Sequence, residues 1–326
     1  MGLRAAAGRI RGEIAALVGH LRDQLREDWD PRYYLTVAGF LALTLGLAYA
    51  FDVEAVHIDP LHLDPLQIPV YVAFYAVPWV VAVVCDAYFH GRRAALRDPK
   101  LWLAGLAALT LFAVYANFHY YVGWIAANIP PAGRAFVFHC AANVLRAGLG
   151  VAMIVAFWWV CDRRRQPLYG LTRAGFRPAP YVLVLLALAP MIAWASYQPD
   201  FLAIYPRHVP GGEMALWGLS KAEVYGIFEL CYGADFLFTE LFFRGLLVLA
   251  FARWLGPGAV MPMVAFYAFT HVSKPVGETI GSVFGGWALG VLAYRTRSIY
   301  GGVTIHLGVA YMMEAAAILQ RATHGL

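Results

Sequence analysis

Long apolar runs constrain this chain more than any other feature. A helix needs ~20 residues to cross the hydrocarbon core of a bilayer, and the sequence contains about nine runs of that order. Hydrophobic residues make up 61% of the chain and charged residues 14%, whereas soluble domains carry ~25% charged residues. The sequence therefore predicts an all-α, polytopic helical membrane protein. The predicted spans are roughly 34–50, 68–89, 101–122, 134–160, 180–197, 222–252, 257–273, 277–294 and 299–320.

The first 33 residues are predicted to form an N-terminal amphipathic helix. Charged residues run through the region where a cleavable signal would have its apolar core, so a signal peptide is not expected. An apolar face at helical spacing favours a helix that lies on the inner leaflet, and the alternative is a short cytosolic helix packed on the rest of the protein. That face consists of Ile10, Ile14, Leu17, Val18, Leu21 and Leu25.

The net charge of +5 is distributed as a membrane protein distributes it. Basic residues gather in alternate connections between spans, as in 92–100, 163–177 and 295–297, while the connection 51–67 contains no Lys or Arg. This positive-inside pattern places the N-terminus in the cytoplasm and predicts membrane lipids, not nucleic acid, as partners. The Ala-, Arg- and Gly-rich composition is typical of a prokaryotic protein, so the inner membrane is the expected location.

A basic, proline-containing stretch is the clearest linker in the chain. It covers 162–179 and separates the front helices, 34–161, from the back helices, 180–326. Most charges inside predicted spans fall in the back segment. We therefore expect the functional site there.

The stretch TELFFRG, 239–245, places a carboxylate and a guanidinium inside an apolar run. Glu240 and Arg244 are spaced i, i+4, so they share a helix face and can pair. Charges inside a membrane are costly and usually mark function. The rise of a helix places Glu240 and His271 ~20 Å and His306 ~14 Å from the cytoplasmic ends of their spans. Three ionisable groups on different helices are thus predicted at a similar level.

Two further acids and a proline accompany these residues. Glu229 lies three helical turns before Glu240 on the same face, and Asp235 lies about one turn before Thr239 on another side. Pro275 follows His271 by four residues and cannot donate to its carbonyl group. The helix is expected to kink or end at the histidine, with the carbonyl left free for a water or a ligand.

A carboxylate and two histidines in a partly dry site can perform peptide-bond chemistry. Glu240 would take a proton from water, while His271 and His306 position the water or stabilise the oxyanion. The alternative is a catalytic Zn²⁺ held by His271, His306 and Glu240, since two histidines and a glutamate match such a site. Spacing alone leaves both mechanisms open.

Three segments resemble the motifs of a known family. TELFFRG, then YAFTH (267–271), then IHLGVA (305–310) are similar to those of the CPBP intramembrane proteases, which include the Rce1-type CAAX prenyl endopeptidases and the bacterial Abi proteins. The resemblance covers about 220–320. It implies an intramembrane endopeptidase, in which Glu240, His271 and His306 are catalytic and Arg244 and Tyr267 support them.

The chain departs from the family pattern at two positions. Thr239 stands where the family has the first of two adjacent glutamates, the one usually assigned to water activation. Ala310 stands where the family has an asparagine, four residues after the histidine that matches His306. Either Glu240 takes over water activation, or Asp235 or Glu229 does, or the protein no longer cleaves.

Three functions follow from these observations. The leading one is an endopeptidase that cleaves a membrane-associated or lipidated peptide or protein, by activated water or as a metalloprotease. The second is an inactive relative that binds a peptide or a partner membrane protein, for which Thr239 and Ala310 are the evidence. A proton- or ion-coupled transporter is the third, because intramembrane glutamate and histidine also serve proton relays.

Overall fold

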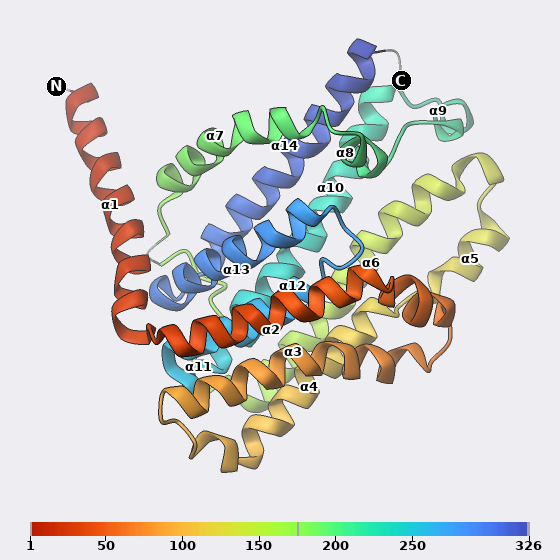
Figure 1. The fold of residues 1–326 in the computed structure, drawn as a ribbon. Coiled ribbons are helices and arrows are strands. Elements are labelled where there is room, and N and C mark those ends of the chain that lie inside the picture. Colours follow the sequence, from red (N-terminus) through yellow and green to blue (C-terminus); the bar gives the residue numbers. More distant parts are fainter. Residues whose placement is uncertain (1, 175, 325–326) are drawn as a thin grey trace. The chain divides into compact units, whose positions relative to one another are not determined.

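The computed structural model describes residues 2–174 and 176–324, with only the backbone described at 2–7, 9, 10 and 324. All regular structure in these ranges is helical (Figure 1), which confirms the predicted all-α fold. Ile10, one of the apolar positions predicted for the N-terminal helix, lies outside the described side chains.

The chain divides into two compact units. The first unit comprises Met1–Asn117, Met153–Pro180 and Glu240–Gly302, and the second comprises Phe118–Ala152, Tyr181–Thr239 and Val303–Leu326. Segments before and after the basic linker contribute to both units, and several helices continue from one unit into the other. The segment boundaries predicted from the sequence stay a prediction.

The first unit is built on long helices joined by short helical turns. Its elements are α1 (Gly2–Asp28), α2 (Pro31–Ala50), η1 (Glu54–Ile58), η2 (Asp59–Leu61), α3 (Gln67–Phe89), η3 (Ala95–Arg97), α4 (Pro99–Ala116), η4 (Leu241–Ala250), α11 (Ala252–Leu255), η5 (Gly256–Ala259), α12 (Val260–Phe269) and α13 (Val276–Thr296).

The second unit contains α5 (Tyr121–Asn128), α8 (Pro199–Ile204) and α9 (Gly212–Trp217). Helices that extend across the boundary between the units supply the rest of it. These are α6 (Pro131–Cys161), α7 (Pro178–Ala195), α10 (Lys221–Glu240) and α14 (Tyr300–His324).

Local sequence explains where two of the helices begin. Asp30 precedes α2 and accepts a hydrogen bond from the Arg32 backbone N–H at 2.9 Å. Asp98 precedes α4 and accepts one from the Lys100 N–H at 2.9 Å. In both helices a proline follows the aspartate, and it fits the first helical position because its missing N–H would have no helical partner there.

Seven helices within the described residues are long and apolar enough to cross a membrane, so the count of nine is not confirmed. The predicted span 222–252 is α10 followed by the π-helix η4, and α10 carries several charged residues. The predicted span 257–273 contains α12, whose ten residues reach only ~15 Å. The seven helices are Pro31–Ala50, Gln67–Phe89, Pro99–Asn128, Pro131–Cys161, Pro178–Ala195, Val276–Thr296 and Tyr300–Thr323.

The short helix α12 forms the core of the first unit. All ten of its residues are buried, and it packs against α3, α13 and η4. Phe266 contacts Tyr75 of α3, Phe112 of α4 and Phe242 of η4, with ring centroids 4.8–5.7 Å apart. A helix that is apolar on every side suits an interior position, because no face of it needs water. The residues of α12, including Tyr267, are therefore surrounded by protein on all sides.

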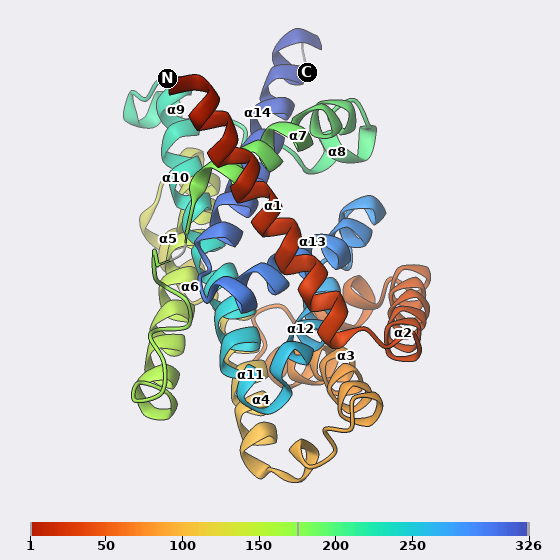
Figure 2. The same cartoon turned by 90° about the vertical axis from the view of Figure 1, so that its left-hand side faces the viewer.

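The helix α1 is anchored at its C-terminal end (Figure 2). Gln24 donates to the carbonyl of Pro257 at 3.0 Å and accepts from Arg295 at 3.2 Å. Ile14 and Val18, on its apolar face, are exposed. The C-terminal end of α1 thus packs on the protein, and whether the helix lies on the inner leaflet or is cytosolic stays a prediction.

Candidate functional site

The Glu240–Arg244 pair is completely enclosed. Glu240 is the last residue of α10, and η4 begins directly after it. Arg244 Nη1 lies 3.0 Å from Glu240 Oε1, and the two side chains are 1% and 0% exposed. This confirms the pairing that the i, i+4 spacing predicted. Each charge depends on the other, since an unpaired charge in such a place is strongly destabilising.

Contacts of the Tyr267 ring connect this pair to His271. The guanidinium carbon of Arg244 lies 4.5 Å from the ring centre of Tyr267, within range of a cation–π interaction. The Tyr267 ring is in turn 4.5 Å from the His271 ring. Gly286 of α13 makes room for the tyrosine, because a Cβ there would come within 3.1 Å of the ring. The first unit therefore brings Glu240, Arg244, Tyr267 and His271 together in one row.

The first turn of α14 lies against the carboxylate. A Cβ at Gly302 would collide with the Glu240 side chain, so only glycine allows this approach. Gly302 is the third residue of α14, where backbone N–H groups and the helix dipole favour a negative charge. The sequence analysis did not identify Gly302, whose only local signal was its position just before the third motif.

His271 lies just beyond the end of α12. The helix ends at Phe269 and α13 begins at Val276, as Pro275 predicted. His271 Nδ1 is 3.0 Å from the Tyr267 carbonyl oxygen, and a carbonyl only accepts hydrogen bonds, so Nδ1 carries the proton. In the neutral ring Nε2 then has the lone pair and can act as a base or as a metal ligand.

The prediction that the His271 carbonyl is free was wrong. It accepts hydrogen bonds from the hydroxyl of Tyr49 at 3.1 Å, from the hydroxyl of Thr279 at 2.7 Å and from the N–H of Lys274 at 3.2 Å. The single hydroxyl hydrogen of Tyr49 is shared with the Lys274 carbonyl, whose oxygen lies closer, at 2.7 Å. Buried carbonyl groups find partners, and here a residue of the distant helix α2 supplies one. Tyr49 thus fixes the loop that carries His271.

The basic linker supports η4. Tyr169 is buried, and its hydroxyl donates to Asp162 at 2.7 Å. A Cβ at Gly245 would come within 2.8 Å of the Tyr169 carbonyl oxygen. The glycine that ends TELFFRG is therefore required for close packing against the linker.

The second unit holds the remaining candidates, Thr239, Asp235, Glu229 and His306. His306 is half-buried, and its ring packs edge-on against Phe236 with centroids 4.7 Å apart. Each of these residues lies on α10 or α14, the helices that also contribute Glu240 and Gly302 to the first unit.

Glu229 belongs to a separate polar cluster within the second unit. Its carboxyl group interacts with that of Glu314, and its backbone carbonyl accepts a hydrogen bond from Tyr311 at 2.9 Å. Glu314 in turn accepts two hydrogen bonds from the N–H of Arg207, at 3.0 and 3.1 Å. Glu229 therefore contacts α14, and Glu314 connects it to the loop before α9.

In the described part of the first unit, Glu240 and His271 are not members of a three-residue metal-ligand group. Arg244 already occupies one carboxylate oxygen of Glu240. His271, however, has the Nδ1 hydrogen bond to a carbonyl that metal-ligating histidines usually have. The histidine fits zinc binding better than the glutamate does.

Comparison with known proteins supports the motif reading. Residues 230–312 match the family model described as type II CAAX prenyl endopeptidase Rce1-like. This confirms the resemblance found from the motifs, over a range that includes Glu240, His271 and His306. No curated protein and no solved structure matches the chain.

Proposed function

We propose, on the premise that residues 230–312 match the Rce1-like endopeptidases, that this integral membrane protein is an intramembrane endopeptidase acting through Glu240. The observation that carries the proposal is the enclosed Glu240–Arg244 pair, connected through Tyr267 to His271 within the matched segment. A carboxylate inside a membrane protein needs a reason to be ionised, and Arg244 supplies it.

Each side chain then has a chemical task. The ionised Glu240 accepts a proton from the attacking water, and the neutral Nε2 of His271 accepts a hydrogen bond that orients this water. His306, the third catalytic residue that the motifs indicate, stabilises the oxyanion in this proposal. Arg244 orients Glu240, and Tyr49 keeps the His271 loop in place. The substrate class is a membrane-associated or lipidated peptide, reached from the cytoplasmic side.

The first experiment compares purified wild type with Glu240→Gln and Glu223→Gln in matched detergent. Glu223 is the control because it lies on the same helix but is exposed, and its carboxylate accepts hydrogen bonds from the backbone and side chain of Ser220. A pooled library of tail and transmembrane peptides, with prenylated and unprenylated CaaX pairs, is incubated with each and analysed by mass spectrometry. We expect Glu240→Gln to lose ~10²–10⁴-fold in cleavage rate, as for removal of a general base, and Glu223→Gln to retain it.

Parallel variants assign the base. If Asp235→Asn or Glu229→Gln abolishes cleavage while Glu240→Gln retains it, the proposed role of Glu240 is wrong. Metal content of the active sample decides the mechanism: full activity with much less than one equivalent of zinc excludes a zinc enzyme.

The alternative is a peptide-binding protein without catalysis, favoured by Thr239 and Ala310. Folded wild type that binds library peptides but cleaves none would support it. Cleavage that appears only in the double variant Thr239→Glu/Ala310→Asn would show that these two positions removed the activity.

A further inference from the structure

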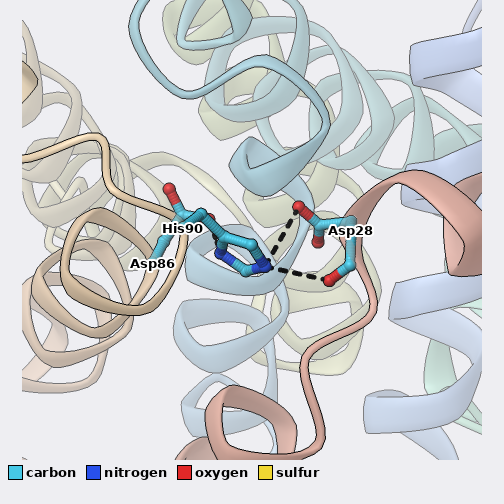
Figure 3. A group of neighbouring side chains, drawn as sticks. All are labelled: Asp28, Asp86 and His90. Carbon is cyan, nitrogen blue, oxygen red and sulfur yellow. Dashed lines mark hydrogen bonds and ion pairs between the residues drawn. The ribbon is translucent and has the colours of Figure 1, made fainter.

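A second group of ionisable side chains lies outside the proposed active site, at the junction of α1 and α3. Asp28 ends α1, Asp86 lies in the last turn of α3, and His90 follows that helix directly (Figure 3). Each residue offers a ligand atom, and these three atoms all lie within 4.8 Å of one another. Asp28 and Asp86 are 1% and 0% exposed. The group is thus a buried meeting point of two helix ends.

The two ring nitrogens of His90 have different surroundings. Nε2 lies 3.0 Å from the Asp28 carbonyl oxygen, which only accepts hydrogen bonds, so Nε2 carries a proton. In the neutral ring the lone pair is then on Nδ1. Nδ1 lies 3.0 Å from Asp86 Oδ1, yet it is buried and the contact lacks hydrogen-bond geometry. Two acceptors face each other, and an ion placed to the side of the line between them satisfies both.

The geometry of this contact is suited to a metal. Ligand nitrogen and oxygen atoms lie ~2.0–2.2 Å from Zn²⁺, so two ligands of one ion can be 3.0 Å apart. The hydrogen bond from Nε2–H to a backbone carbonyl is the orienting contact that metal-bound histidines usually have.

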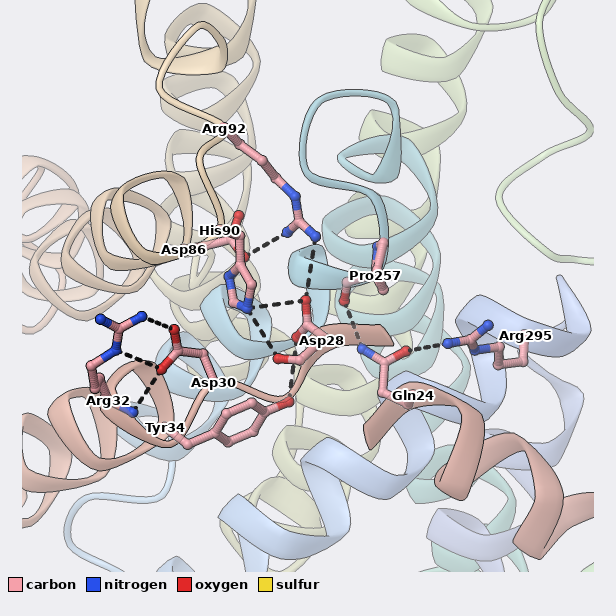
Figure 4. A network of polar contacts seen from close by, with 10 residues as sticks. All are labelled: Gln24, Asp28, Asp30, Arg32, Tyr34, Asp86, His90, Arg92, Pro257 and Arg295. Atoms are coloured by element: carbon pink, nitrogen blue, oxygen red, sulfur yellow. Dashed lines mark hydrogen bonds and ion pairs between the residues drawn. The ribbon is translucent and has the colours of Figure 1, made fainter. Parts of the chain in front are cut away.

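The charges of the group do not balance around a neutral His90. Two carboxylates face one guanidinium, with Arg92 Nη1 2.7 Å from Asp86 Oδ1 and Nη2 3.4 Å from Asp28 Oδ1 (Figure 4). Asp86 Oδ2 is buried without a hydrogen-bond partner among the described residues. The site therefore favours additional positive charge.

Arg92 can give way to such a charge. Its side chain is 23% exposed, whereas the side chains of both aspartates are 0% exposed, so the guanidinium has a path to water. The backbone of Gly258 packs directly against this contact, because a Cβ there would collide with the Asp86 carboxylate and the Arg92 guanidinium. The guanidinium can therefore leave only outward, toward water, while the aspartates stay buried.

We propose that Asp28, Asp86 and His90 form a binding site for a divalent transition-metal ion, tested first as Zn²⁺, and that the Arg92 guanidinium is exchanged for it. One imidazole and two carboxylates suit Zn²⁺ or Mn²⁺, whereas Mg²⁺ favours oxygen ligands alone and Cu⁺ favours sulfur. The ion balances both carboxylates and fastens α1 to α3. Metal binding thereby controls how firmly α1 is held to the rest of the first unit.

The test is calorimetric titration of Zn²⁺, with Mn²⁺ and Mg²⁺ in parallel, into the full-length protein in detergent after removal of metals with EDTA. His90→Ala should weaken Zn²⁺ binding at least ~10-fold, and Arg92→Ala should strengthen it ~10-fold because the competing cation is gone. His57→Ala is the control, since His57 is exposed and lies outside the group. His271→Ala removes zinc binding at the proposed active site, so the two sites are separated by stoichiometry.

The expected result is one Zn²⁺ that depends on His90 and is insensitive to His57→Ala and His271→Ala. Equal binding to wild type and His90→Ala would show adventitious binding and overturn the proposal. Arg92→Ala leaves all three ligands intact, and weaker binding to this variant would overturn the proposal as well. Each folded variant should also show a rise in melting temperature with Zn²⁺ that follows its affinity.

Discussion

The Glu240–Arg244 pair and the group around Asp28 and Asp86 both combine buried carboxylates with arginine in the first unit, and they differ in charge balance. Glu240 faces Arg244 alone, with both side chains at most 1% exposed. Asp28 and Asp86 share Arg92, whose side chain is 23% exposed, and His90 lies beside them. The first pair is neutral and sealed. The second group is short of positive charge and partly open to water.

This difference shows what each place can do. A balanced pair keeps one carboxylate ionised at a fixed position, as a general base requires, and catalysis also requires that water reaches Glu240 when substrate is bound. An unbalanced group with an exchangeable cation responds to protons and metal ions in solution. Burial alone does not distinguish them, since four of the five carboxylate and arginine side chains compared are at most 1% exposed.

The largest expected effect is loss of the partner in the sealed pair. Arg244→Met should destabilise the protein by about 3–5 kcal/mol, because Glu240 is left buried without a counter-charge. Arg92→Met should cost less, since Asp28 can take up a proton. Denaturant titration in detergent measures the free energy of unfolding of both variants. Equal losses of stability would show that the two places do not differ in this way. The double variant Glu240→Gln/Arg244→Met should recover part of the stability.

A smaller effect is expected from crowding Glu240. Gly302→Ala places a methyl group against the carboxylate and should cost about 1–3 kcal/mol as well as cleavage activity. Gly285→Ala is the matched control, because a Cβ there meets nothing within 4 Å and alanine favours the helix. Thermal unfolding and peptide cleavage are measured for both glycine variants. Identical behaviour of the two would contradict the close approach of Gly302 to Glu240.

The group of Asp28, Asp86 and His90 should make the stability of the protein depend on pH. The pKa of Asp28 is raised from 3.8 to about 6, so the folded state binds its proton more tightly than the unfolded state. Its contribution is fully present below pH ~4 and is lost as pH rises through ~6, on the order of 3 kcal/mol. Other groups that titrate or carry charge surround the Asp28 carboxyl group. These are Asp86, His90, Arg92 and Tyr34.

The measurement for Asp28 is therefore a difference. Stability of wild type minus that of Asp28→Asn, in metal-free buffer between pH 4 and 7, should fall with rising pH. A flat difference would show that Asp28 is not the group responsible.

The smallest effect concerns the support of His271. Tyr49→Phe removes one of the donors to the His271 carbonyl and should cost about 1 kcal/mol, because the N–H of Lys274 and the hydroxyl of Thr279 still donate. Turnover should fall while KM is unchanged, as for a positioning residue. Tyr120→Phe, at an exposed tyrosine, is the control. A change in KM alone would indicate that Tyr49 contacts substrate instead.

Sequence alone determined the features that depend on neighbours in the chain. Apolar runs predicted an all-helical membrane protein, i, i+4 spacing predicted the Glu240–Arg244 pair, and Pro275 predicted the helix end near His271. These follow from helix geometry and from what one residue does to the next few. The motifs also indicated the family that residues 230–312 match.

Only the tertiary structure decided which distant residues meet. Tyr49 reaches the His271 carbonyl from α2, Gly302 makes room for Glu240, and His90 lies between Asp28 and Asp86. None of these contacts has a local signal, because helical periodicity tells which face is apolar but not which helix covers it. The same limit explains α12: its apolar run predicted a membrane span, but its ten residues form a buried helix too short to cross.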